Sequence, residues 1–161
     1  MQIVYRQVDN RTVKRFVLAL VCAFCCFTSY GQQHPCSTAE ADKADRVASR
    51  LRSWGTLYDS YKRFHHCDDG SIAEGFSESV ARILVGHWDT LPEISSVSKN
   101  DPQFRTFILR HVSATLAIDD LKKIRRNASN RCPDGESETC KQLGIASNRA
   151  LKANSGVNNE K

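Results

Sequence analysis

The sequence predicts an all-α protein, a single compact bundle of about four to five helices stapled by two disulfides after a cleaved signal peptide. Three observations predict this architecture. From Thr38 nearly to the C-terminus, apolar residues recur at three- and four-residue steps, the period of an amphipathic helix. No stretch shows sustained apolar alternation, and no hairpin dipeptide lies between alternating runs, as a β protein would require. An even number of cysteines follows the apolar leader.

Residues 1–31 have the features of a secretory signal peptide. A basic flank precedes "FVLALVCAFCCF", twelve consecutive apolar residues, and small residues follow at Ser29 and Gly31. A helix of this length, at about 1.5 Å per residue, falls well short of the ~30 Å hydrocarbon core of a bilayer. We therefore expect cleavage between Gly31 and Gln32 and a periplasmic or secreted protein. The alternative is an uncleaved membrane anchor.

Removal of this leader changes both charge and length. The whole chain has 23 Lys and Arg against 18 Asp and Glu, and the leader holds four of the bases and one acid, so the net charge falls from +5 to near +2. That balance removes the main support for a nucleic-acid partner. About 130 residues remain, enough for one core. We expect a helical domain at 32–143, no stable membrane span, and a flexible tail at 144–161, where the helix-forming signal fades.

The four cysteines outside the leader predict two disulfides, because an even count in an oxidising compartment favours pairing. These are Cys36, Cys67, Cys132 and Cys140. Loop closure favours Cys132–Cys140, since the intervening "PDGESET" consists of turn-forming and polar residues, and this leaves Cys36–Cys67. The rival pairing joins Cys67 to Cys132 and Cys36 to Cys140.

The first two helices are predicted from apolar stripes. The first runs from Thr38 to near Cys67, with a kink or short break at Gly55, and its stripe is Val47, Leu51, Trp54, Tyr58, Tyr61 and Phe64. The second starts at Ser71, which forms a capping-box pattern with Glu74. Its stripe is Ile72, Phe76, Val80, Ile83, Leu84 and Trp88.

Later elements follow the same rules. "TLPEISSVSKN" is expected to be a short connecting helix or loop. The next helix has Asp101 as N-cap and Pro102 at its first position, and its stripe is Phe104, Phe107, Ile108, His111, Val112 and Thr115. The last clear helix is "IDDLKKIRRNASNR", with Ile118, Leu121, Ile124 and Ala128 on one side.

The stretch "HHCDDGSIAEGF", residues 65–76, raises the question of a metal site. An EF-hand loop with Gly70 at its sixth position would place Phe76 at the twelfth, where an acid is required. Adjacent histidines such as His65 and His66 point about 100° apart on a helix and do not easily share one ion. We therefore expect no metal or cofactor and interpret the stretch as a disulfide-stapled corner between two helices, with Gly70 in the left-handed conformation.

No convincing catalytic set is present, and we assign no catalytic residue. Glu74 with Asp69 or Asp89 could form a carboxylate pair for glycoside cleavage, but acids at helix starts are common because the helix dipole favours them. His111 lies within an apolar stripe, which is typical of a core histidine. The common hydrolase and phosphate-binding motifs, GxSxG, HExxH and the glycine loop, are missing.

The leader, the single helical domain, the cysteine pairs and the segment "CDDGSIAEGFSESVARIL" resemble small periplasmic proteins of Gram-negative bacteria. In architecture, roughly from Cys36 to Cys140, the chain is similar to the type VI secretion amidase-immunity proteins. This resemblance implies a helical inhibitor that binds and neutralises a toxin and performs no chemistry. It carries over no individual functional residue.

We therefore expect a non-enzymatic, secreted or periplasmic protein that acts by protein–protein binding. The candidate contact residues lie in loops between stapled helices and on a basic helix face: Asp68, Asp69, Gly70, Trp88, Asp89, Glu93, Lys122, Lys123, Arg125 and Arg126. One alternative is a small envelope enzyme acting on cell-wall glycans through Glu74 and His111. Another is a periplasmic metal-binding protein that uses His65, His66, His87 and His111.

Overall fold

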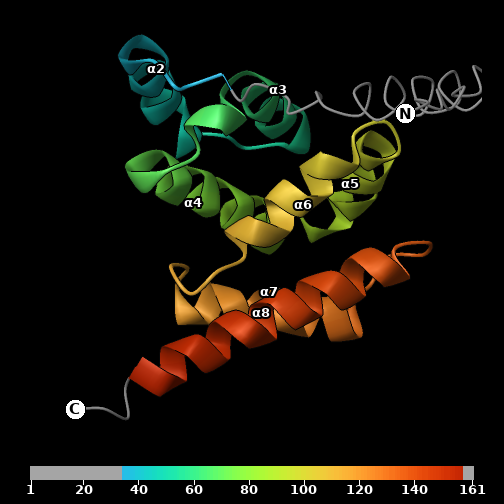
Figure 1. Ribbon diagram of the computed structural model, residues 1–161. Coiled ribbons are helices and arrows are strands. Elements are labelled where there is room, and N and C mark those ends of the chain that lie inside the picture. Colours follow the sequence, from blue (N-terminus) through green and yellow to red (C-terminus); the bar gives the residue numbers. More distant parts are fainter. Residues whose placement is uncertain (1–33, 158–161) are drawn as a thin grey trace, which may run out of the picture. The chain divides into compact units, whose positions relative to one another are not determined.

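The computed structural model describes residues 34–157. The predicted signal peptide, 1–31, and its cleavage point between Gly31 and Gln32 lie outside the described residues. Within 34–157 the chain forms seven α-helices and two short 3-10 helices, without any strand (Figure 1). The all-α prediction is confirmed, and this part of the chain contains more helices than the four or five expected.

The helices follow one another with short connections. In chain order they are α2 (Thr38–Ala48), α3 (Trp54–Phe64), η1 (His65–Cys67), α4 (Gly70–Gly86), η2 (Trp88–Thr90), α5 (Leu91–Ser98), α6 (Pro102–His111), α7 (Ile118–Asn130) and α8 (Ser137–Val157). The expected short connecting element is thus a helix, α5.

The helix expected from Thr38 to Cys67 is two helices, and the break lies before Gly55. Helix α2 ends at Ala48, and α3 starts after Ser53, which forms a reciprocal capping box with Thr56. Gly55 lies inside α3. Val47, next to the last residue of α2, is 36% exposed and does not belong to the core. Periodicity did not reveal the break, since the apolar residues on either side keep a helical spacing across it.

Helices α2 and α4 approach closely. A Cβ at Gly75 would lie 2.9 Å from the Ala48 Cβ, which is closer than side-chain carbons approach one another. Next to it, the Ser79 hydroxyl donates to the Ala48 carbonyl over 2.5 Å and accepts from the Leu51 amide over 3.2 Å. Ser79 of α4 therefore satisfies backbone groups that the end of α2 leaves free.

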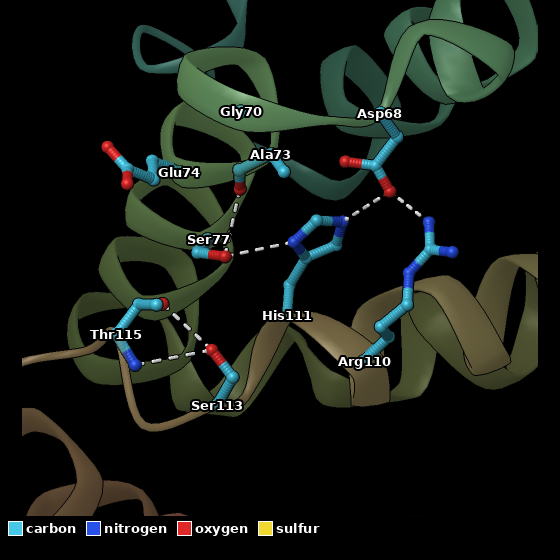
Figure 2. A pocket seen from close by; sticks show the side chains of 9 residues that line it. All are labelled: Asp68, Gly70, Ala73, Glu74, Ser77, Arg110, His111, Ser113 and Thr115. Atoms are coloured by element: carbon cyan, nitrogen blue, oxygen red, sulfur yellow. Dashed lines mark hydrogen bonds and ion pairs between the residues drawn. The ribbon is translucent and has the colours of Figure 1, made fainter.

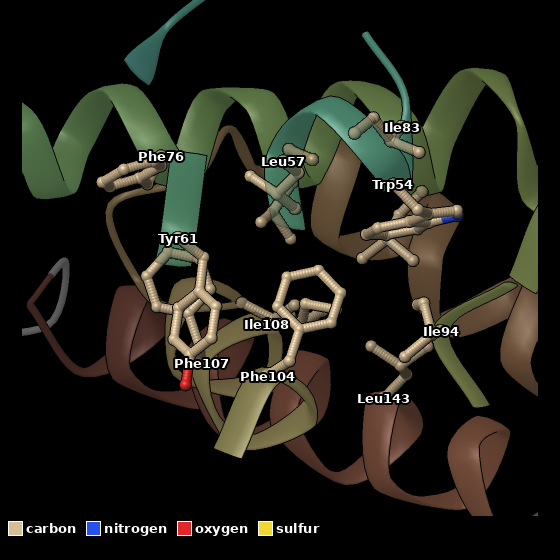
Figure 3. Packing of buried hydrophobic residues seen from close by; sticks show 14 of the residues in the cluster. Trp54, Leu57, Tyr61, Phe76, Ile83, Ile94, Phe104, Phe107, Ile108 and Leu143 are labelled. Carbon is tan, nitrogen blue, oxygen red and sulfur yellow. The ribbon is translucent and has the colours of Figure 1, made fainter. Parts of the chain in front are cut away.

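The core between α3, α4 and α6 is aromatic (Figure 3). Phe107 lies 4.9 Å from Tyr61 and 5.2 Å from Phe76, measured between ring centroids. Offset and edge-on ring pairs at such distances add to the free energy gained from burial. Trp54 is 1% exposed, and its indole N–H donates to the Thr90 hydroxyl over 2.9 Å. The predicted stripes, including that of α3, largely supply this core, although Thr115 is exposed.

Two predicted helix starts are settled by the structure. Helix α4 is capped by Asp69, whose carboxylate accepts from the Gly70 amide over 2.8 Å. The prediction of a Ser71 capping box is therefore wrong, and Ser71 instead donates to Asp45 of α2. Asp101 does occupy the N-cap position of α6. Its carboxylate, however, accepts hydrogen bonds from Tyr58 and Lys62 of α3 rather than from its own helix.

The predicted flexible tail, 144–161, is wrong for residues 144–157, which continue helix α8. This helix packs along α7 (Figure 1). Leu143 and Ser147 are fully buried, and Ala150 is 4% exposed. The Asn, Ser and Gly residues of this segment lower its helix propensity, but burial of one face against a neighbour provides most of the stability of protein helices.

On α7, Ile118 was expected on the apolar side of the helix. It is 43% exposed and does not belong to the core.

Both disulfides have the preferred pairing. Cys36–Cys67 joins the segment before α2 to η1, and Cys132–Cys140 joins the α7–α8 connection to the first turn of α8. Gly70 has a φ of 51°, the left-handed value expected for it, although it begins α4 rather than ending the preceding helix. Among the described helices, none is long and apolar enough to cross a membrane.

Candidate functional site

A half-open pocket of about 370 Å³ lies beside the Cys36–Cys67 disulfide corner. We call it the Asp68 pocket (Figure 2). Its walls come from the turn before α4, the first half of α4, the end of α6 and the segment after α6. The lining residues are Asp68, Gly70, Ala73, Glu74, Ser77, Arg110, His111, Ser113 and Thr115.

The Asp68 carboxylate is the most unusual group in this pocket. Its side chain is only 2% exposed. One oxygen, Oδ2, accepts a hydrogen bond from Arg110 and lies 3.2 Å from His111 Nε2. The other, Oδ1, is buried and has no hydrogen-bond partner among the described residues, and Figure 2 shows it pointing away from Arg110. A buried acceptor without a partner costs about 1–3 kcal/mol, so a donor that enters the pocket would be bound favourably.

His111 connects Asp68 to α4. Its Nδ1 lies 2.9 Å from the Ser77 hydroxyl oxygen, and that hydroxyl is also 2.9 Å from the Ala73 carbonyl. The single Ser77 proton goes either to Ala73 or to His111. If it goes to His111, the imidazole hydrogen lies on Nε2 and is donated to the Asp68 carboxylate; if it goes to Ala73, His111 Nδ1 donates to the Ser77 oxygen. His111 is 3% exposed, which confirms its interpretation as a core histidine.

Serine, histidine and aspartate form a line here, but the geometry does not suit nucleophilic catalysis. Ser77 lies in the middle of α4 and is 5% exposed. A nucleophile needs access to a substrate carbonyl and free N–H groups to stabilise an oxyanion, whereas the amides around Ser77 are used within the helix. The pocket supports binding better than it supports chemistry.

The proposed carboxylate pair is not assembled in this pocket either. Glu74 lines the pocket, but neither Asp69 nor Asp89 does. Asp69 caps α4, and Asp89 is exposed in η2. Figure 2 shows the Glu74 carboxylate pointing away from His111, so the two residues named for the enzyme alternative do not converge.

The predicted partner-contact residues divide into three groups. Asp68 and Gly70 line the pocket, and exposed Asp69 lies between them in the chain. Trp88 is wrong as a contact residue, because it is 4% exposed and its indole N–H donates to the Arg131 carbonyl over 2.7 Å.

The remaining candidates are exposed but do not line the Asp68 pocket. Exposed Asp89 and Glu93 lie on η2 and α5. The basic face of α7 is exposed at all four predicted positions: Lys122, Lys123, Arg125 and Arg126. Two of these side chains make long hydrogen bonds, Lys122 to Asp119 over 3.5 Å and Arg125 to Asn148 over 3.4 Å. These residues remain available for a partner.

Sequence reasoning missed Ser77 and Arg110 as pocket residues. Neither belongs to a short motif, since Ser77 lies 9 residues after Asp68 and Arg110 lies 42 residues after it. The one usable signal was the predicted burial of His111, because a buried imidazole must find hydrogen-bond partners and the polar corner near Asp68 could supply one.

The histidines expected for a metal-binding protein do not come together. His65 Nδ1 lies 2.9 Å from the Tyr61 carbonyl oxygen, His87 is exposed, and His111 lies in the Asp68 pocket. A different group is assembled next to the Cys36–Cys67 disulfide: ligand atoms of His34, Glu40 and His66 lie within 4.8 Å of one another. Among the described residues this is the group that could hold a metal ion.

No match to this chain was found among protein-family models, curated proteins or solved structures. The resemblance to amidase-immunity proteins is thus neither supported nor contradicted by a relative. The site and the fold alone carry the functional argument.

Proposed function

We propose that this protein works by binding another protein, and that a hydrogen-bond donor of the partner enters the Asp68 pocket. The observation that carries this proposal is the buried Asp68 Oδ1, which lacks a partner among residues 34–157 at the wall of a half-open pocket. An amide, hydroxyl or ammonium group of the partner would satisfy it once a side chain at the pocket wall moves aside, because Oδ1 is buried. The other carboxylate oxygen is already held by Arg110 and His111, which fixes the orientation of the acceptor.

The site is rigid enough for selective binding. Cys67, next to Asp68, is 4% exposed and covalently tied to Cys36. His111 fixes the opposite wall through Ser77 of α4. Groups held in their bound conformation lose little conformational entropy on association, and this raises affinity. The pocket thus offers a fixed acceptor rather than a flexible loop.

We further propose that the protein is exported to the periplasm or secreted and acts there as a toxin-neutralising inhibitor. Two disulfides are typical of proteins in oxidising compartments. The inhibitor role follows from the resemblance in architecture to amidase-immunity proteins, and the poor catalytic geometry around Ser77 agrees with it. The Asp68 pocket and the neighbouring exposed Asp69 would then contact the toxin.

A matched pair of variants tests the binding site. Thr115 is exposed and lines the Asp68 pocket, whereas Thr106 is exposed and lies in a groove between α6 and α8 that shares only Arg110 with the pocket. The wild-type protein, Thr115→Trp and Thr106→Trp would each be immobilised and exposed to an envelope extract of the source organism. We expect a partner that wild type and Thr106→Trp retain and that Thr115→Trp binds at least ten-fold more weakly.

A partner bound equally by both tryptophan variants would place the contact elsewhere and contradict the role of the pocket. If the captured protein is a cell-wall hydrolase, its activity should fall to zero at one equivalent of the wild-type protein. Full hydrolase activity in the saturated complex would exclude the inhibitor role while leaving the binding role intact.

A further inference from the structure

The Cys36–Cys67 disulfide brings two short segments together, the residues before α2 and the turn η1. His34 lies two residues before Cys36 in the first segment, Glu40 lies in the first turn of α2, and His66 precedes Cys67 in η1. The imidazole rings of His34 and His66 meet edge to face, with centroids 5.7 Å apart. We propose that His34, Glu40 and His66 form a zinc-binding site, distinct from the Asp68 pocket.

The spacing of the ligand atoms fits a tetrahedral ion. His66 Nε2 lies 3.4 Å from Glu40 Oε1. Zinc binds histidine nitrogen and carboxylate oxygen at about 2.0–2.2 Å, so two ligands of a tetrahedral site lie about 3.4 Å apart. All three ligand atoms already lie within 4.8 Å of one another. His34 is exposed at the start of the described chain, and a small side-chain rotation would bring its ring onto the ion.

The ligand atoms are also free to coordinate. His66 Nε2 is buried and makes no hydrogen bond within residues 34–157, despite its closeness to Glu40. The Ser37 amide and hydroxyl donate to Glu40 Oε2, over 3.1 Å and 2.6 Å, which leaves Oε1 facing His66. The same hydrogen bonds hold the Glu40 carboxylate in the orientation that coordination requires.

Two histidines and one glutamate are a ligand set that zinc accepts, and three protein ligands leave a fourth position for water or for a side chain of a partner. The disulfide prearranges this site, because it holds the two segments together before the metal binds. Zinc affinity should therefore depend on an intact Cys36–Cys67 bond. Zinc binding and its dependence on the disulfide can both be measured with zinc as the only added ligand.

The experiment titrates zinc into the metal-free, oxidised protein, produced without a histidine tag, and follows the heat of binding. We expect one zinc per chain. Glu40→Gln and His66→Gln should each weaken binding at least ten-fold. Glutamine is acceptable at position 40 of the capping box, so α2 keeps its N-cap. His87→Gln is the matched control, since His87 is exposed and outside the ligand group, and its affinity should equal that of wild type.

Three results would overturn the proposal. One is the absence of zinc binding, which would leave His66 and Glu40 as an ion pair only. The second is zinc binding whose affinity Glu40→Gln and His66→Gln leave unchanged. Binding to the new amino terminus of the processed chain through His34, without Glu40 or His66, would give this result. The third is an effect of His87→Gln on zinc affinity as large as that of His66→Gln.

A separate variant tests the role of the disulfide. Cys36→Ser/Cys67→Ser should bind zinc at least ten-fold more weakly while circular dichroism shows that its helices are retained. Zinc affinity equal to that of wild type in a folded variant would contradict the prearrangement of the site by the disulfide.

Discussion

Two corners of this protein are each closed by a disulfide, and the side chains beside the two bonds differ. Cys36–Cys67 spans 31 residues and lies beside a buried ionic network and a group of metal-ligating side chains. Cys132–Cys140 spans 8 residues and secures the turn into α8. We call them the long-loop corner and the short-loop corner. The comparison indicates that the short-loop disulfide serves local structure, whereas the long-loop disulfide also positions the side chains of the two proposed sites.

Removal of the disulfides should give the largest changes in the free energy of unfolding, and the two corners should differ in the size of this change. In the chain-entropy description, a bond that closes 31 residues stabilises the fold by about 3.7 kcal/mol, and one that closes 8 residues by about 2.5 kcal/mol. Cys36→Ala/Cys67→Ala should therefore lower the free energy of unfolding more than Cys132→Ala/Cys140→Ala, as measured by urea denaturation. The reverse order would show that strain or residual structure, rather than loop length, decides the effect.

The single variant Cys67→Ala should behave like the double variant, with a loss of about 2–5 kcal/mol. An unchanged denaturation midpoint for Cys67→Ala would show that the long-loop bond does not constrain the unfolded chain.

The buried acids at the two corners provide the next test. Asp68 meets the charged donor Arg110 and the imidazole of His111, whereas Glu136 accepts from the neutral hydroxyl of Ser95. A hydrogen bond to a carboxylate contributes about 1.5–3 kcal/mol, and Asp68 has two such partners, one of them a charged guanidinium, whereas Glu136 has the neutral Ser95 hydroxyl. Asp68→Asn should consequently destabilise the protein more than Glu136→Gln in thermal and urea unfolding.

Equal losses for these two amide variants would contradict the view that the ionic network is specific to the long-loop corner. A stabilising effect of Asp68→Asn would indicate that desolvation of the carboxylate exceeds the free energy gained from its two partners.

Glycine packing distinguishes the helix pairs next to the corners. A Cβ at Gly75 would clash with Ala48 at 2.9 Å, whereas a Cβ at Gly144 of α8 would meet the Ala128 Cβ at an ordinary 3.8 Å. Gly75→Ala should cost about 1–3 kcal/mol through overpacking of α2 against α4. Gly144→Ala should stabilise the protein by about 0.5–1 kcal/mol, because alanine has the higher helix propensity. Chemical denaturation of the two variants side by side checks the difference in sign.

The sequence predicted the helical class, the disulfide pairing and most of the α4 and α6 core, because these depend on periodicity, cysteine count and loop closure. It placed the kink or break of the first helix at Gly55 rather than before Trp54, since the capping pair Ser53 and Thr56 lacks the glutamate or glutamine of the common capping box. It also did not predict helix α8. That segment is stabilised by burial of Leu143 and Ser147 against α7, a tertiary effect that local propensity does not contain.

Only part of the candidate site could be predicted from the sequence. The corner at Asp68 and Gly70 was identified because turn and cap chemistry is local. Its partners Arg110 and Ser77 come from α6 and α4, and their contact with the corner depends on how the helices pack. His34 and His66 lie 32 residues apart in the chain and were not connected, although the predicted disulfide between Cys36 and Cys67 already required their segments to meet. A predicted disulfide is thus also a prediction about the side chains beside it.

The smallest expected effect concerns Glu40 at the long-loop corner. Hydrogen bonds from Ser37 hold the pKa of this carboxyl below its usual value of 4.5. A lowered pKa in the folded state means that the contribution to stability is complete above the unfolded-state pKa and disappears as the pH falls through the folded-state pKa. Glu40→Gln should therefore be slightly less stable than wild type at pH 7, and the difference should shrink on acidification below 4.5, as followed by thermal unfolding without metal.

The double variant Ser37→Ala/Glu40→Gln identifies the cause of this pH dependence. In the Ser37→Ala background the two hydroxyl contacts between Ser37 and Glu40 are lost, so the added effect of Glu40→Gln should depend less on pH. If the pH dependence persists unchanged, the Ser37 amide and the charges of His66 and His34, rather than the Ser37 hydroxyl, lower the pKa of Glu40. That outcome would show that the side chain of Ser37 is not the main cause of the low pKa at this position.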